Sequence, residues 1–149
     1  MAAKHNIIAT IQALLQQNLA EAQLALSTTQ ASLGNETKST AGDKYETGRA
    51  MVQIELQKMA DQRDKIDLQL QTLARVDAHH VSNLVEFGSL VTTDKEAYFV
   101  AIGLGKVPFE GRTCYAISID SPIGKALKGK KSGDKLQFQG REIVIRTIE

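Results

Sequence analysis

Two acidic residues spaced by one helical turn, Asp43 and Glu46, are the residues of this sequence best suited to chemistry. A carboxylate pair at positions i and i+3 lies on one face of a helix, where both side chains can share a hard divalent cation such as Mg²⁺. Mg²⁺ keeps several waters and takes few protein oxygens, so an isolated pair binds it poorly. The spacing therefore predicts a cation site that a second macromolecule must complete.

The same spacing also fits a structural role. An acid at the N-cap of a helix, followed by another three residues later, satisfies free backbone N–H groups and complements the helix dipole. The residues alone favour capping over metal binding, although the two roles can coexist. The neighbouring Lys44, Tyr45 and Arg49 add groups that can meet another macromolecule.

Two long helices are predicted to position the acidic pair. Residues 5–33 and 44–75 contain no proline, have helical periodicity and are separated by the polar sequence GNETKSTAGD. A short connection makes the helices antiparallel, with the region near Leu26 facing that near Val52. At ~1.5 Å per residue, such helices form an arm roughly 45 Å long. The predicted heptad seam comprises Ile8, Ile11, Leu15, Leu19, Ala22, Leu26, Thr29 and Leu33, then Tyr45, Arg49, Val52, Leu56, Met59, Arg63, Ile66, Leu70 and Leu73.

The second half of the chain has a different composition, with most of the glycines, both prolines and short apolar runs. Strands are predicted at 90–93, 97–103, 113–119, 136–139 and 142–148, in an antiparallel sheet. A short helix through Leu127 is predicted to cross the sheet, with Ser121 as its cap and Pro122 in its first turn. The fold class is therefore α+β, with an arm at 1–76 and a sheet domain at 77–149.

Charge and composition exclude several classes of function. The net charge is +1, so duplex nucleic acid is a weak default partner, although Lys125, Lys128, Lys130 and Lys131 form a local basic patch. Three tyrosines, four phenylalanines and no tryptophan argue against a large aromatic-lined ligand pocket. Binding on surfaces is favoured instead. The lone Cys114 is expected on a strand in or near a core.

The sequence shows neither a signal-peptide pattern nor a membrane-spanning segment. The start lacks a signal-peptide pattern, and no run approaches ~20 apolar residues, so we expect a cytoplasmic protein without a membrane partner. A monomer is expected, because each helical seam has its partner within the chain. His79 and His80 are interpreted as solvated linker residues; a metal site there would need further ligands such as Asp77 or Glu86.

Three features resemble the Gre transcript-cleavage factors of bacterial RNA polymerase: VEFG at 85–88, ISIDSPIGKALKGKKSGD at 117–134, and the Asp-x-x-Glu at the arm tip. The resemblance covers nearly the whole chain. It implies a C-terminal domain similar in fold to FK506-binding proteins, which docks at the rim of the secondary channel of the polymerase. The coiled coil would enter that channel, so that the polymerase hydrolyses RNA in a backtracked RNA/DNA elongation complex.

The resemblance also implies roles for individual residues. Asp43 and Glu46 would help hold the second catalytic Mg²⁺, shared with the polymerase, and would position water; the chain would not be an enzyme by itself. Binding residues would be Lys44, Tyr45 and Arg49 at the tip, and Ser121, Pro122, Ile123, Gly124, Lys125, Lys128, Lys130 and Lys131 in the C-terminal block.

Other interpretations remain open. The family usually continues after its tip acid with Asn-Ala-Glu-Tyr, whereas this chain has ETGRAM around Glu46, so a non-cleaving regulator in the same channel is one alternative. A structural coiled-coil adaptor is another, with the two acids only capping a helix. A prolyl isomerase is disfavoured by the few aromatics. A regulator of nucleoside diphosphate kinase, with a similar C-terminal domain, is disfavoured by the length of the arm.

Overall fold

The structure is a computed structural model that describes residues 2–36 and 43–149. Within the two long helices, side chains are described for residues 3–32 and from residue 48 onward. The chain divides into two compact units, Leu14–Leu70 on the one hand and Met1–Ala13 with Gln71–Glu149 on the other. The predicted domains, 1–76 and 77–149, remain a prediction about which segments fold independently.

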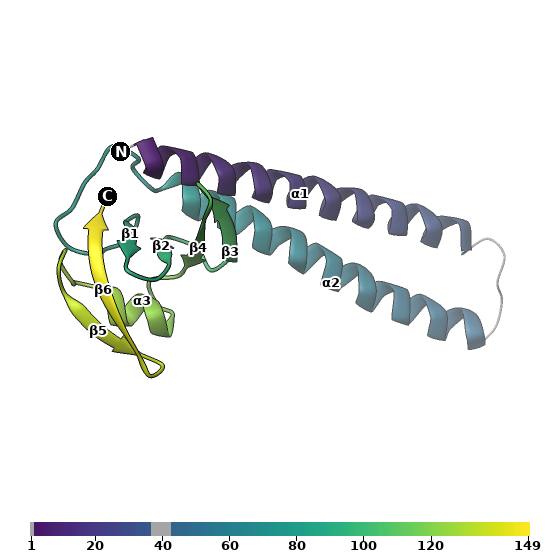
Figure 1. Cartoon of the computed structure of the whole chain (residues 1–149). Helices are drawn as coiled ribbons and strands as arrows, with labels where there is room; N and C mark the ends of the chain where they lie inside the picture. Colours follow the sequence, from purple (N-terminus) through teal and green to yellow (C-terminus); the bar gives the residue numbers. More distant parts are fainter. Residues whose placement is uncertain (1, 37–42) are drawn as a thin grey trace. The chain divides into compact units, whose positions relative to one another are not determined.

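The unit Leu14–Leu70 consists of two long helices that run side by side in opposite directions (Figure 1). The first helix is the part of α1, Ala2–Glu36, that begins at Leu14, and the second is the part of α2, Asp43–Ala74, that ends at Leu70. Burial follows the predicted seam: Leu15, Leu26 and Ile66 are buried, and Val52 is half-buried. A hollow of about 380 Å³ is lined from both helices, by Leu26, Gln30, Gln53, Leu56, Gln57, Ala60 and Arg63. The pairing of Leu26 with the region after Val52 confirms the antiparallel hairpin. Arg49, predicted in the seam, is instead exposed.

The first turns of α1 belong to the other unit, where Lys4 ties them to the segment that follows α2. Its side chain is only 3 % exposed, and its Nζ donates a hydrogen bond of 2.9 Å to the carbonyl oxygen of His80. Burial lowers the pKa of Lys4. Ile7, Ile11 and Leu73 are buried in the same unit. A lysine thus satisfies a backbone carbonyl that would otherwise lose its hydrogen bond.

The rest of this unit is a six-stranded sheet with the order β3-β4-β2-β1-β6-β5 and one short helix. The strands are β1 Leu90–Thr93, β2 Ala97–Val100, β3 Gly105–Phe109, β4 Arg112–Ile117, β5 Lys135–Phe138 and β6 Arg141–Ile148. The helix α3 spans Pro122–Leu127, between β4 and β5. The predicted strands and the short helix are therefore confirmed, with ends shifted by a few residues.

The prediction of a wholly antiparallel sheet is wrong at one pairing. Strands β2 and β4 are parallel, with Tyr98 opposite Tyr115. The reason is β3, which was not predicted: it follows β2, lies at the sheet edge and turns back into β4. β3 contains Pro108, and a proline is tolerated on an edge strand, where one backbone position needs no N–H donor. The turn uses Glu110 and Gly111, both with positive φ, as a two-residue hairpin of the primed type requires.

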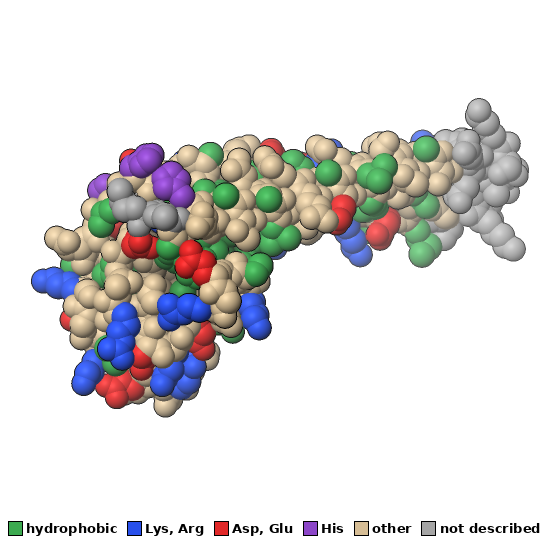
Figure 2. All heavy atoms as spheres, turned by 45° about the horizontal axis from the view of Figure 1, so that its top comes forward, with side chains coloured by type: hydrophobic (Ala, Val, Ile, Leu, Met, Phe, Trp, Pro, Cys, Tyr) green, Lys and Arg blue, Asp and Glu red, His purple; other side chains and the backbone are tan. Residues whose placement is uncertain are grey.

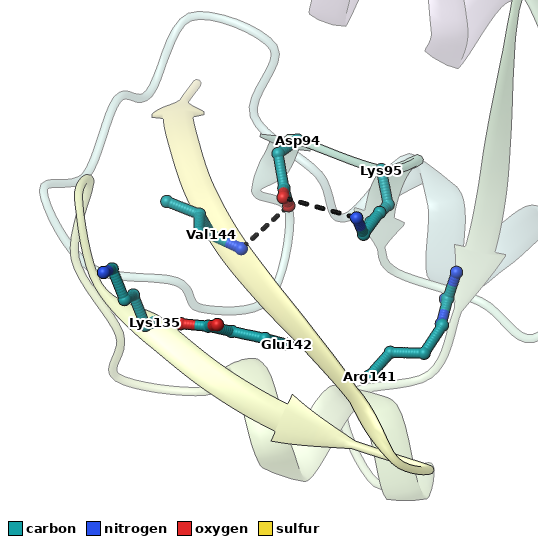
Figure 3. Close-up of a pocket in the computed structure, with 6 residues that line it drawn as sticks. All are labelled: Asp94, Lys95, Lys135, Arg141, Glu142 and Val144. Carbon is teal, nitrogen blue, oxygen red and sulfur yellow. Dashed lines mark hydrogen bonds and ion pairs between the residues drawn. The ribbon is translucent and has the colours of Figure 1, made fainter.

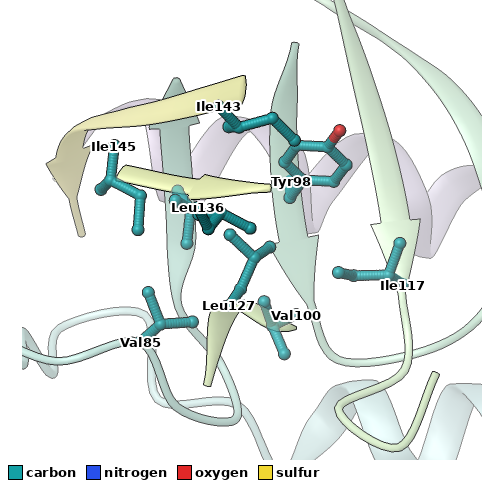
Figure 4. Packing of buried hydrophobic residues seen from close by; sticks show 9 residues of the cluster. Val85, Tyr98, Val100, Ile117, Leu127, Leu136, Ile143 and Ile145 are labelled. Atoms are coloured by element: carbon teal, nitrogen blue, oxygen red, sulfur yellow. The ribbon is translucent and has the colours of Figure 1, made fainter. Parts of the chain in front are cut away.

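Alternate residues of several strands form a hydrophobic core that packs against α3. Figure 4 shows Leu127 of α3 among side chains from several strands. The buried cluster comprises Val85, Val91, Tyr98, Val100, Ile117, Leu127, Leu136, Ile143 and Ile145. Strand β2 is buried along its whole length, as expected of a central strand. Cys114 lies buried on β4, as predicted, and burial raises the pKa of its thiol to about 12.

Candidate functional site

The tip acids Asp43 and Glu46, with Lys44 and Tyr45, lie outside the residues whose side chains the structure describes. Helix α2 begins at Asp43, so both acids are in its first two turns. Arg49 is exposed on the same helix. The predicted cation site and the binding roles of these residues therefore remain predictions.

The block from Ser121 to Gly124 has clear structural roles. The Ser121 hydroxyl donates to the carbonyl of Ser118 at 2.6 Å and accepts from the N–H of Gly124 at 3.1 Å, which caps α3. Pro122 occupies the first turn, where no N–H partner is needed. Gly124 is buried, and a Cβ added there would lie 2.1 Å from the Ser118 carbonyl oxygen. Three residues predicted to bind a partner are thus needed to build the helix.

The lysines of the block lie mostly on the surface. Lys125, Lys128 and Lys131 are exposed, and Lys130 is half-buried. The backbone of this segment pairs with Val85: the Gly129 N–H donates to the Val85 carbonyl, and the Val85 N–H donates to the Lys130 carbonyl, both at 2.9 Å. The two sequence features at 85–88 and 117–134 therefore meet in space.

A small hollow, the aromatic hollow, opens between α3 and the sheet. Its volume is about 270 Å³, and it is lined by Glu96, Tyr98, Tyr115, Ile117, Ile123, Phe138, Gln139 and Arg141. The rings of Tyr98 and Tyr115 stack with centroids 6.0 Å apart. Ile123 is the one residue of α3 that reaches it. The sequence argued only against a large aromatic pocket, and it missed this smaller one because the lining comes from several strands.

A charged pair closes one side of the aromatic hollow. Arg141 donates two hydrogen bonds to the Glu96 carboxylate, at 3.1 and 3.2 Å, and the Tyr98 hydroxyl donates a third at 3.1 Å. The Arg141 guanidinium is the largest of the influences that lower the pKa of Glu96. Burial, followed by the Glu96 charge, raises the pKa of Tyr98 to about 12. Tyr98 therefore stays a neutral donor, and the pair adds no net charge to the hollow.

This pair makes a testable contribution to acid stability. Because the folded state lowers the pKa of Glu96, the stabilisation is present above the ordinary glutamate pKa and is lost as pH falls through the folded value. Arg141→Met should therefore lower Tm by ~1–4 °C at pH 7 and have less effect near pH 3. Thermal unfolding across this pH range is the measurement, with Lys106→Met as the charge control. An equal loss at both pH values would contradict the assignment.

Next to the aromatic hollow, Arg141 also borders a second hollow of about 420 Å³, which carries mixed charge (Figure 3). Its other lining residues are Asp94, Lys95, Lys135, Glu142 and Val144. Asp94 accepts the Val144 N–H at 2.9 Å and pairs with Lys95 at 3.7 Å. The lining has three basic and two acidic side chains, and Arg141 is already paired with Glu96, so this hollow has no clear preference for a ligand charge.

All three histidines of the chain gather on one face (Figure 2). His5 of α1 contacts His79 edge to face, with centroids 4.8 Å apart, and His80 Nε2 lies 2.9 Å from Glu86 Oε1. The sequence missed His5, because only folding brings it to the linker. Among the described residues, no group of three or more His, Cys, Asp or Glu side chains is placed to hold a metal ion. The side chains of His79 and His80 are exposed, and their interpretation as solvated linker residues stays a prediction.

Comparison with known proteins identifies the relatives. The transcription elongation factor GreA of Bacillus cereus is 42 % identical over 80 residues, covering 48 % of each chain. GreA of Bacillus licheniformis is 33 % identical over 78 residues, covering 51 % of this chain and 47 % of the relative. These relatives confirm the resemblance to the Gre family. The chain spans about half the length of the Gre proteins it matches.

The chain was also compared with solved structures and with models of protein families. The solved structure of the transcription factor Gfh1 covers 92 % of both chains at 21 % identity, with a TM-score of 0.36. No family model matches the chain. In the described part of the chain, no helix is both long and apolar enough to span a bilayer.

Proposed function

We propose that this protein is a transcription elongation factor of the Gre type. In this proposal it binds bacterial RNA polymerase, places the helical hairpin in the secondary channel and stimulates cleavage of backtracked RNA by the polymerase. The protein contributes no active site of its own. It supplies Asp43 and Glu46 to a Mg²⁺ ion that the polymerase already holds.

The observation that carries the proposal is the block at 117–134. Its residues build a capped helix whose flanking segment pairs with Val85, so the sequence resemblance to Gre factors rests on one three-dimensional element. A shared sequence block that forms a defined local structure is stronger support than a short motif alone. The similarity to GreA proteins over about half of the chain agrees with it.

The helical hairpin supports the mechanical part of the proposal. Within the unit Leu14–Leu70, the part of α2 from Asp43 to Leu70 gives a hairpin roughly 40 Å long at ~1.5 Å per residue. A rod of this length can carry two carboxylates to a buried site. In a two-metal hydrolysis, a weakly held second cation limits the rate, and extra carboxylates would stabilise it in the transition state.

A non-cleaving regulator of the same channel is the second candidate, favoured by Gly48. This residue lies within α2, where glycine costs ~1 kcal/mol relative to alanine, although a Cβ there would meet nothing within 4 Å. No close contact therefore requires a glycine at position 48. Gly48 is part of the sequence around Glu46 that departs from the usual Gre pattern, and this departure is what favours a regulator that does not stimulate cleavage.

One experiment separates these candidates. The purified protein is added to RNA polymerase of the source organism, halted in a backtracked complex with 3′-labelled RNA. A Gre-type factor should speed release of the short 3′ fragment by at least ~10-fold in the presence of Mg²⁺. Binding without release would favour the non-cleaving regulator. The absence of binding would reject both.

A further inference from the structure

Two imidazole rings, those of His5 and His79, meet from distant parts of the chain. His5 lies in the first turns of α1, His79 lies in the segment after α2, and their ring centroids are 4.8 Å apart. Both residues are exposed, on the face where the histidines gather (Figure 2). Water and dissolved ions can therefore reach both rings.

The separation of the two rings matches that of two histidines bound to one metal ion. A Zn²⁺ ion lies ~2.0–2.1 Å from an imidazole nitrogen and therefore ~3.2 Å from the centroid of that ring. At tetrahedral or right-angled ligand positions, the centroids of two bound rings are then ~4.5–5.2 Å apart. The 4.8 Å between His5 and His79 lies within this range. The exposed rings would have to turn to aim a nitrogen at the ion, but the backbone would not have to move.

The neighbouring charges favour a cation at this place. Asp77 Oδ1 accepts the His79 N–H at 2.9 Å, and this hydrogen bond is the largest of the influences that lower the pKa of Asp77. Asp77 therefore carries its negative charge at neutral pH. Lys4 is the nearby cation, but its side chain is buried and donates to the His80 carbonyl oxygen. The His80 ring is engaged elsewhere, because its Nε2 lies 2.9 Å from Glu86 Oε1.

We propose that His5 and His79 bind one divalent transition-metal ion of the Zn²⁺ type, and that water completes its coordination. Imidazole nitrogens suit Zn²⁺, Ni²⁺ and Cu²⁺, whereas Mg²⁺ prefers oxygen ligands and keeps its waters. The described residues hold no group of three or more His, Cys, Asp or Glu side chains for a metal, so the site has two protein ligands. It is therefore weaker than a structural zinc site with four protein ligands.

A bound ion would join the start of α1 to the segment after α2. The two ligands are far apart in the sequence, so the unfolded chain seldom brings them together. The ion would consequently bind the folded protein in preference and stabilise it. The site needs no RNA polymerase, so its test is independent of the proposed function.

Two measurements on the full-length chain test the site. Isothermal titration calorimetry with Zn²⁺ gives the affinity and the number of ions, and the protein carries no affinity tag, because tag histidines bind the same ion. We expect one Zn²⁺ per chain. Thermal unfolding should show a Tm raised by at least ~2 °C at Zn²⁺ concentrations ~100-fold above the Kd. Mg²⁺ at the same concentrations should leave the Tm unchanged.

Substitutions assign the ligands. Because the loss of a group that only supports a ligand already costs ~10–100-fold in metal affinity, His5→Asn and His79→Asn should each raise the Kd for Zn²⁺ at least ~10-fold. His80→Asn is the matched control, since it removes an exposed histidine of the same segment, and it should change the Kd less than ~3-fold. His5→Phe keeps an aromatic ring against His79 without a ligating nitrogen, and it should lose as much affinity as His5→Asn. Thermal unfolding in EDTA shows that each variant is folded.

The other outcomes overturn the proposal. A parent chain without saturable Zn²⁺ binding has no such site. If His5→Phe binds Zn²⁺ as tightly as the parent, the contact between the rings is packing alone. A loss in His80→Asn equal to that in His79→Asn would move the site away from His5. One Zn²⁺ per two chains, with a dimer in sedimentation, would place the ligands on two copies instead of one.

Discussion

Replacing Gly124 by alanine should destabilise the sheet unit by about 2–4 kcal/mol, the cost of forcing atoms into a filled space. An added Cβ would lie 2.1 Å from the Ser118 carbonyl oxygen and 2.8 Å from that of Ile119. Both are backbone atoms, so no rotamer change relieves the contact. Helix α3 would have to move, and with it the fully buried Leu127.

Urea unfolding of the full chain measures this loss. Gly103→Ala is the matched control, since a Cβ there meets nothing within 4 Å and its φ is not positive. Gly129→Ala should cost about 1 kcal/mol, because only its φ of 79° opposes a side chain. If Gly124→Ala unfolds at the same urea concentration as Gly103→Ala, close packing of α3 is not why this position is glycine.

The largest functional effect is expected at the tip. Asp43→Asn and Glu46→Gln should each reduce stimulated RNA cleavage by at least ~10-fold, a loss of ~1.4 kcal/mol in transition-state stabilisation. In the proposed function, each substitution removes a negative charge from the Mg²⁺ shared with the polymerase while keeping side-chain shape, and asparagine can still cap a helix. Stability and polymerase binding should therefore change little, and the variants should compete with the parent protein.

The control for the tip is Glu55→Gln, which removes an exposed acid farther along α2. This variant should stimulate RNA cleavage by the polymerase as strongly as the parent protein does in the backtracked-complex assay. If the Asp43→Asn/Glu46→Gln double variant stimulates cleavage fully, the two acids have no role in cleavage and serve only as helix caps. A parent protein that binds polymerase but does not stimulate cleavage would instead support the non-cleaving regulator.

Local patterns predicted the helices and most of the strands. The heptad seam marked Leu15, Leu26 and Ile66 as buried, because a long proline-free helix fixes which residues share a face. Ser121 and Pro122 located α3 through capping chemistry that involves only neighbouring residues. In these places the physical cause lies within a few positions of the residue concerned.

Long-range pairings could not be predicted in the same way. The parallel pairing of β2 with β4 depends on the edge strand β3, which was not predicted. The aromatic hollow is lined by Tyr98, Tyr115 and Phe138, which come from three different strands. Their spacing in the sequence does not predict that they lie close together. His5 likewise reaches His79 only through the fold. The predicted binding residues included Ile123, but the sequence did not distinguish it from its neighbours as the residue of α3 that lines the hollow.

The place of β6 in the sheet has a consequence for the growing polypeptide. It lies between β1 and β5, and the backbones of Leu90 and Glu149 exchange two hydrogen bonds of 2.9 Å. Strand β4 ends at Ile117 and β6 at Ile148, so at about 5–20 residues per second the ribosome needs roughly 2–6 s between them. During that interval one edge of β1 has no neighbour. An unpaired edge is a template for other chains, so the nascent protein is most prone to misassociation in those seconds.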